Sequence, residues 1–76
     1  MICTLLGVGH GQTKKDNRAF TVLHYSYCDA RVEGQAVDKS FIYDGSAVVL
    51  PVGVVPGDQI DLQFNQNGFL TEIRSL

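Results

Sequence analysis

The clearest structural signal in this sequence is a pair of alternating segments on either side of Asn67-Gly68. Residues 59 to 65 alternate strictly between polar and apolar side chains, which is the spacing of the two faces of a β-strand. Asn-Gly between two such segments predicts a type I′ turn, with residues 69 to 76 returning as the second strand of a hairpin. The side chains expected to point inward are Ile60, Leu62 and Phe64.

Three further segments, at residues 2–9, 19–28 and 36–43, have the β-branched and aromatic composition of strands. Residues 46–55 are apolar but contain Pro51 and Gly53, which predicts a short edge strand followed by a loop. No window of helical length shows a helical apolar stripe. Closure of a small sheet removes its exposed edges. We therefore expect an all-β chain that forms a small five-stranded OB-like barrel, with an SH3-like barrel as the related alternative.

A chain of 76 residues is expected to form a single domain, residues 1–76, with a thin core. The segment Ala47 to Val55 carries more branched aliphatic side chains than such a core easily buries, so it belongs either to the core or to an interface. We expect a homodimer that uses this segment. Its aliphatic residues are Val48, Val49, Leu50, Val52, Val54 and Val55.

Nothing in the sequence indicates export, a membrane span or a cofactor. No apolar run approaches the length of a membrane span, and no basic region precedes the first apolar residues. We expect a cytoplasmic protein, in which Cys3 and Cys28 are free thiols. These cysteines show no metal-ligand spacing with His10 and His24, so no metal site is expected.

The segment Gln12 to Tyr27 joins a cluster of cations to an aromatic strand. Lys14, Lys15 and Arg18 lie within five positions around a turn-forming Asp-Asn pair, and residues 19 to 27 follow with strand composition. Cations neutralise phosphates and aromatic faces stack bases, so this arrangement is typical of single-stranded nucleic-acid binding. The alternative is an ordinary solvated hairpin loop leading into a core strand.

The net charge of −2 is low for a nucleic-acid-binding protein, but its distribution is uneven. Residues 1–43 carry five of the six cations and four acids, whereas residues 44–76 carry one cation and four acids. One basic face and one acidic face are therefore compatible with the composition.

The chain resembles the helix-destabilising, gene V type single-stranded-DNA-binding proteins of filamentous phages. Two stretches that cover about half the chain carry the resemblance. They are Gly11 to Tyr27, with its Thr-Lys-Lys loop and aromatic strand, and the hairpin made of Pro56-Gly57, Ile60-x-Leu62-x-Phe64 and Gly68-x-Leu70. The family's loop usually has a glycine and then a proline before the aromatic residue, where this chain has Asp16-Asn17-Arg18-Ala19-Phe20.

This resemblance implies an OB-type barrel, a symmetric dimer and sequence-independent coating of single-stranded DNA, in a protein of phage or mobile-element origin. The sequence alone leaves DNA and RNA open as ligands. The resemblance puts three cations in the binding loop, Phe20 with Tyr25 or Tyr27 on or beside the binding face, and Arg31 in the next hairpin. The candidate nucleic-acid-binding residues are Lys14, Lys15, Arg18, Phe20, Tyr25, Tyr27, Arg31 and Lys39.

Two other functional classes are an enzyme and a protein-interaction module. The chain lacks a glycine-rich phosphate loop, a His-Glu-x-x-His motif and a nucleophile elbow, so we do not expect an enzyme. The main alternative is a small protein-interaction module that binds a host or replication protein, because an interaction module would also use the apolar residues 47–55.

Overall fold

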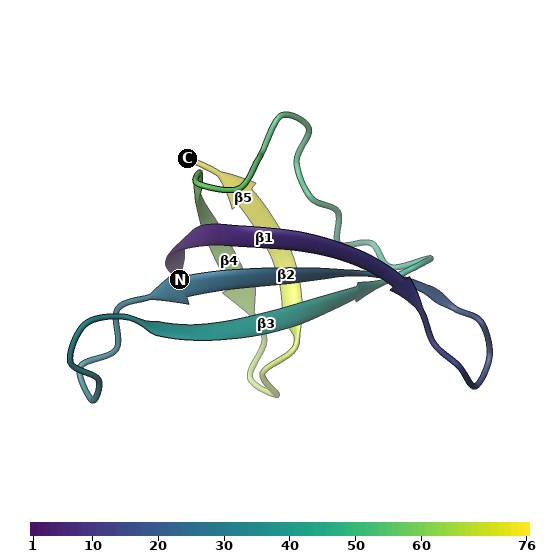
Figure 1. Cartoon of the computed structure of the whole chain (residues 1–76), viewed down its shortest axis with the longest axis horizontal. Coiled ribbons are helices and arrows are strands. Elements are labelled where there is room, and N and C mark those ends of the chain that lie inside the picture. Colours follow the sequence, from purple (N-terminus) through teal and green to yellow (C-terminus); the bar gives the residue numbers. More distant parts are fainter.

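Five strands form one antiparallel sheet in the computed structural model, which describes residues 1–76 (Figure 1). The strand order is β3-β2-β1-β4-β5, and the structure contains no helix. The all-β prediction is therefore confirmed. The strands are β1 (Ile2–Gln12), β2 (Ala19–Tyr27), β3 (Ala36–Tyr43), β4 (Gln59–Phe64) and β5 (Leu70–Ser75).

The long strand β1 connects the two halves of the sheet. Almost its whole length pairs with β2, whereas only Ile2 to Thr4 pair with β4. Between Leu5 and Gly7 the register with β2 shifts, which marks a β-bulge. Figure 1 shows β4 and β5 crossing behind the ribbon formed by β1, β2 and β3. The sheet is not closed, because β3 and β5 are its two unpaired edges.

The core lies between the two halves of the sheet and is thin, as expected for this length. Only eight residues are buried, and four of them have fully buried large side chains. Because alternate residues of a strand face opposite sides, the core takes every second side chain of β1, β2 and β4. The buried apolar residues are Cys3, Leu5, Leu23, Tyr25, Ile60, Leu62 and Ile73.

The segment between β3 and β4 forms no strand, so the edge strand predicted within residues 46–55 is absent. Its far end is hydrogen bonded to β1, where the amide of Leu5 donates to the carbonyl of Asp58 and the amide of Gly57 donates to the carbonyl of Leu5. The aliphatic residues of the segment divide into two groups. Val48, Leu50 and Val54 pack against the core, and Val49, Val52 and Val55 are exposed.

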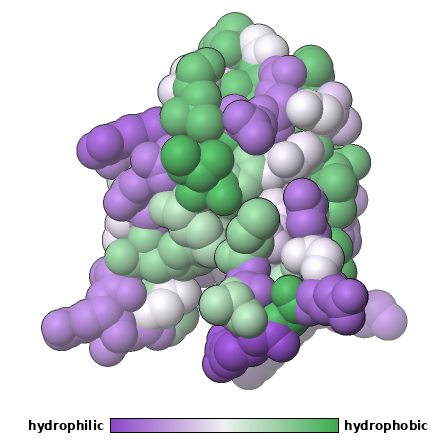
Figure 2. Space-filling view, turned by 90° about the vertical axis from the view of Figure 1, so that its left-hand side faces the viewer, coloured by the Kyte–Doolittle hydropathy of each residue, from purple (hydrophilic) through white to green (hydrophobic).

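These exposed valines contribute an apolar surface. Their exposed fractions are 69% for Val49, 104% for Val52 and 55% for Val55. Figure 1 places the β3–β4 segment at the top of the molecule, and Figure 2 shows apolar residues reaching the surface at the top and down the centre. The segment therefore supplies both core and surface.

The turn between β4 and β5 differs from the predicted type I′ turn. That turn requires positive φ at both central residues, but here only Gly68 has positive φ, at 83°. The side-chain Oδ1 of Asn65 instead accepts hydrogen bonds from the amides of Asn67 and Phe69, at 2.9 and 3.0 Å. This local bonding favours a wider loop, and the register of the hairpin shifts between Gln63 and Phe64.

The two cysteines are both free thiols in the structure. Cys3 and Cys28 form no disulfide, and Cys3 is buried while Cys28 is exposed. Burial raises the pKa of the Cys3 thiol. No helix long and apolar enough to cross a membrane is present.

Candidate nucleic-acid interface

Three aromatic rings gather on the face of β2 and β3 that points away from the core. The register pairs Phe20 with Tyr43 and Val22 with Phe41, and directly opposite residues of an antiparallel pair share a face. The ring of Phe20 lies 5.4 Å from that of Phe41 and 6.2 Å from that of Tyr43, measured between centroids. The rings of Phe41 and Tyr43 are 6.3 Å apart and nearly parallel. We call these three residues the aromatic cluster.

Glycines on β1 make room for this cluster. Gly11 pairs with Phe20 and Gly9 pairs with Val22. A Cβ atom on Gly11 would lie only 2.8 Å from Cζ of Phe20, and one on Gly9 would lie 2.9 Å from Cγ1 of Val22. The ring of Phe20 therefore extends over β1 at a position where any other residue would carry a side chain.

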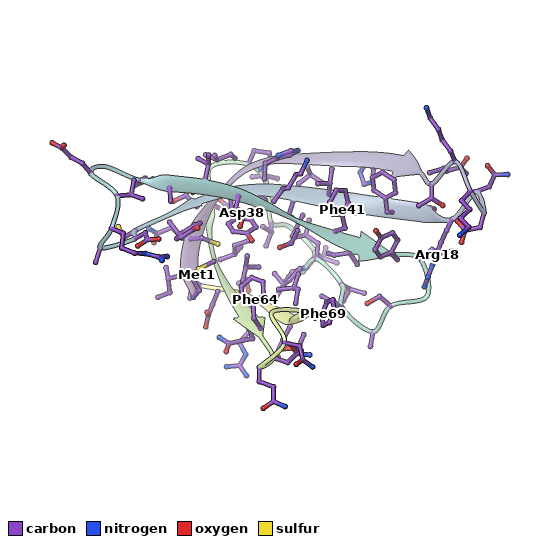
Figure 3. The ribbon with its side chains drawn as sticks, turned by 90° about the horizontal axis from the view of Figure 1, so that it is seen from below. Met1, Arg18, Asp38, Phe41, Phe64 and Phe69 are labelled. Atoms are coloured by element: carbon purple, nitrogen blue, oxygen red, sulfur yellow. The ribbon has the colours of Figure 1, made fainter.

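Two cations lie over the rings of the cluster. The guanidinium of Arg18 is 5.3 Å from the centroid of Tyr43, and Nζ of Lys39 is 5.7 Å from that of Phe41. Arg18 also donates a hydrogen bond of 3.3 Å to the carbonyl of Asp44. Figure 3 shows Arg18 beyond the end of β3 and Phe41 on that strand. The exposed aromatic surface is thus accompanied by positive charge at both of its ends.

The loop from Thr13 to Arg18 is held by its own hydrogen bonds. The amide of Thr13 donates to the carbonyl of Arg18, and the amide of Asn17 donates to the carbonyl of Thr13. The hydroxyl Oγ1 of Thr13 accepts from the amide of Arg18 and donates to the carboxylate of Asp16. This bond lowers the pKa of Asp16. Asn17 adopts the left-handed region, with φ of 53°, which asparagine tolerates better than most residues.

Lys14 and Lys15 lie in this loop, which projects from the right-hand end of the sheet in Figure 1. Both are exposed, and neither forms an ion pair. Their charges are therefore free to meet an anionic ligand near the Arg18 end of the cluster.

The other sequence-predicted residues lie elsewhere. Tyr25 is 3% exposed, and its hydroxyl is 2.9 Å from Oγ of Ser40, so its ring belongs to the core and is closed to a stacking base. Burial raises its pKa. Tyr27 is on the same face of β2 and is half-buried beside Tyr25. Because alternate strand residues point in opposite directions, both are directed away from Phe20.

Arg31 is in the β2–β3 loop, at the opposite end of the sheet from Lys14 and Lys15 (Figure 1). Its guanidinium donates to both carboxylate oxygens of Asp29, at 3.2 and 3.0 Å. This pairing lowers the pKa of Asp29 and leaves Arg31 with a partner of opposite charge. The structure does not bring Arg31 to the aromatic cluster.

Sequence reasoning did not include Phe41 and Tyr43 among the site residues. The signal was present, since both share one face of the third strand with Lys39. What it lacked was the register that sets this face beside Phe20 rather than beside Tyr25. No group of three or more His, Cys, Asp or Glu side chains is placed to hold a metal ion.

Comparisons with known proteins add no relationship to this geometry. No protein-family model matches the chain, and neither a curated protein nor a solved structure matches it.

Proposed function

We propose that this protein binds single-stranded nucleic acid through the aromatic cluster and the cations around it. The observation that carries the proposal is the placement of Arg18 over Tyr43 and of Lys39 over Phe41, two exposed rings that pack beside the half-buried ring of Phe20. Bases of any sequence present flat faces that stack on aromatic rings, and the phosphates between them are attracted to nearby cations. Such binding depends little on sequence. DNA is the proposed ligand, and RNA offers the same chemistry.

We further propose that the sheet is an OB-type barrel left partly open between β3 and β5. OB folds are partly open five-stranded barrels that bind oligonucleotides on the face of their second and third strands and at the loop between the first and second. The aromatic cluster occupies that face, and Lys14 and Lys15 occupy that loop. This correspondence supports the proposed relationship to the gene V type proteins, and with it a phage or mobile-element origin.

Fluorescence anisotropy with labelled oligo(dT) at two salt concentrations tests the proposal. If three cations each meet a phosphate, the slope of log K against log salt is about −2 per subunit. Phe41→Ala removes one stacking ring and should weaken binding by about 5- to 150-fold, the equivalent of roughly 1 to 3 kcal/mol. Replacing Lys14 and Lys15 by glutamate should abolish binding with the fold intact.

The matched control is Val37→Ala. Val37 lies on the same strand and the same face as Phe41, and at 69% it is more exposed, but it has no ring. Its replacement should leave the affinity nearly unchanged. Absence of wild-type binding to oligo(dT) at low salt would remove the proposal, as would equal affinities of Phe41→Ala and Val37→Ala.

We also propose a homodimer that buries the exposed valines of the β3–β4 segment. Val49, Val52 and Val55 lie outside the core and outside the aromatic cluster. A standard interface buries about 800 Å² on each partner, and two-fold symmetry is the commonest closed arrangement. The same valines are the observation that favours the second candidate function, a protein-interaction module whose partner covers them in place of a second copy.

A further inference from the structure

Next to the aromatic cluster, the same face of the sheet carries a pair of basic side chains, His24 and Lys39. The register of β2 and β3 sets them directly opposite each other, two residues along from the pair Val22 and Phe41. Two residues of a strand span about 7 Å. Both basic side chains are exposed. The pair therefore lies beside the cluster, at the end opposite Arg18.

The two side chains are close together, and neither forms an ion pair. The amide of Lys39 donates to the carboxylate of Asp38 and not to β2. His24 and Lys39 are thus a non-hydrogen-bonded pair, in which Cβ atoms are typically about 4.5 to 5.5 Å apart. Like charges directly opposite each other are destabilising. A protonated His24 beside Lys39 therefore favours an anion that lies between them.

This face of β1, β2 and β3 carries no acidic side chain. Asp38 is the only acidic residue of the three strands, and its side chain alternates to the opposite face. On β1 the residue opposite His24 is Gly7, where an added Cβ atom would meet nothing within 4 Å. An anion that approaches His24 therefore meets Lys39 and open space, although the chain has a net charge of −2.

The other neighbours of the pair do not ionise near neutral pH. The side chains that flank it on this face are Val22, Ser26, Val37 and Phe41. The acids of the adjoining β2–β3 loop are Asp29, which is paired with Arg31, and Glu33, which is exposed. His24 is consequently the one group on this face whose charge changes in the range where histidine titrates.

We infer that His24, in its protonated form and beside Lys39, binds a phosphate of the strand whose bases stack on the aromatic cluster. This inference rests on the proposed nucleic-acid binding. Both ring nitrogens of a protonated imidazole donate hydrogen bonds, and its charge adds to that of the neighbouring ammonium. The proton and the phosphate each favour the binding of the other. The affinity for the strand therefore rises as the pH falls through the titration range of histidine.

Anisotropy of labelled oligo(dT), measured at about pH 5.5 and about pH 7.5, tests the inference, because these values bracket the titration of histidine. Neither thymine nor the phosphodiester changes its charge in this range. The wild type should bind about tenfold more tightly at the lower pH, which is the low end for a hydrogen bond between charged groups. Its slope of log K against log salt should become steeper by about 0.7, the effect of one more cation on a single strand.

Two substitutions of His24 should remove this pH dependence. His24→Gln keeps a polar side chain that takes up no proton, so its affinity should be the same at both pH values. His24→Lys is charged at both values and should show the steeper salt slope at both.

His10→Gln is the matched control, because His10 is the only other histidine of the chain and is also exposed on a strand. It pairs with Thr21, and its ring is beside the hydroxyl of that residue on the opposite face of the sheet. This variant should therefore keep the wild-type rise in affinity.

The outcomes separate this inference from the proposed function. Absence of wild-type binding at both pH values would remove the function itself. Wild-type binding with the same affinity at both values would overturn the inference and leave the function standing. A rise that persists in His24→Gln or His24→Lys, or that disappears in His10→Gln, would also overturn it, because the titrating group would then lie elsewhere. Circular dichroism at both pH values checks that each variant is folded.

Discussion

At the scale of single residues, the aromatic cluster depends on Gly11, which has no side chain. The ring of Phe20 occupies the space where Gly11 would carry a Cβ atom. Gly11→Ala should push this ring out of place, lower the free energy of unfolding by about 1 kcal/mol, at the low end of the cost of overpacking, and weaken oligo(dT) binding. Chemical denaturation and anisotropy measure the two effects.

Gly7→Ala is the control for this residue-scale prediction. Gly7 lies on the same strand, has no positive φ, and a Cβ added to it would meet nothing within 4 Å. Alanine there restricts the unfolded chain, so the protein should become more stable by about 0.4 to 1 kcal/mol with unchanged oligo(dT) binding. If both alanine variants shift stability in the same direction and by the same amount, the close approach of Phe20 to Gly11 has no energetic role.

At the scale of elements, the Thr13–Arg18 loop depends on the ionisation of Asp16. The hydroxyl of Thr13 lowers the pKa of Asp16 below its ordinary value of 3.8. Because the pKa is lower in the folded state, this bond stabilises the loop fully above the unfolded pKa and is lost as the pH falls through the folded value. An NMR titration of the Asp16 carboxyl carbon should have its midpoint below 3.8 in the wild type, and Thr13→Val should raise it.

Asp29 is the internal control in the same spectra. Its pKa is lowered by Arg31 in the β2–β3 loop, so Thr13→Val should leave its titration unchanged. A midpoint of Asp16 that does not move in Thr13→Val would mean that the hydroxyl of Thr13 does not hold the carboxylate in solution.

The sequence alone predicts some of the strands correctly and others not. Residues 36–43 form a strand with the predicted bounds, and residues 59–63 keep the predicted alternation, because both are short and strongly patterned. Phe64 was predicted to point inward, but it is 36% exposed at the shift in register between β4 and β5. Residues 46–55 were predicted to include a strand, yet their valines divide between core and solvent. Local propensity could not reveal this division, because the end of the segment is fixed by hydrogen bonds between Asp58, Gly57 and Leu5, far away in the chain.

The candidate site shows the same limit. Both faces of β2 carry apolar and aromatic residues, so periodicity alone does not tell which face is buried. The structure buries Leu23 and Tyr25 and leaves Phe20 beside Phe41. Packing against β4 and β5 decides which face of β2 is buried, and the sequence of β2 alone does not show where those two strands lie. Arg18 was predicted from its place in the basic loop and Lys39 from its charge, whereas Phe41 and Tyr43 required the β2–β3 register.

At the scale of the whole molecule, the proposed dimer predicts which valines control assembly. Val54 is half-buried against the core, so the exposed pair Val49 and Val52 is the sharper target. Val49→Asp combined with Val52→Asp would place carboxylates in an apolar contact. We expect these carboxylates to weaken the free energy of dimerisation by about 3 kcal/mol, which corresponds to a roughly hundredfold rise in the dimer dissociation constant. Sedimentation equilibrium should show a wild-type dimer at tens of micromolar and a folded monomer for this double variant.

Val37→Asp is the matched comparison for the dimer, because Val37 is as exposed as Val49, at 69%, but lies on β3 outside the β3–β4 segment. It should remain dimeric, since an added carboxylate there meets no partner copy. A wild type that is monomeric at tens of micromolar would reject the dimer and leave the exposed valines to a different protein. If Val37→Asp dissociates the dimer as much as the double variant does, general charge repulsion explains the effect and not the loss of the valine surface. The dimer contact would then lie outside the exposed valines of the β3–β4 segment.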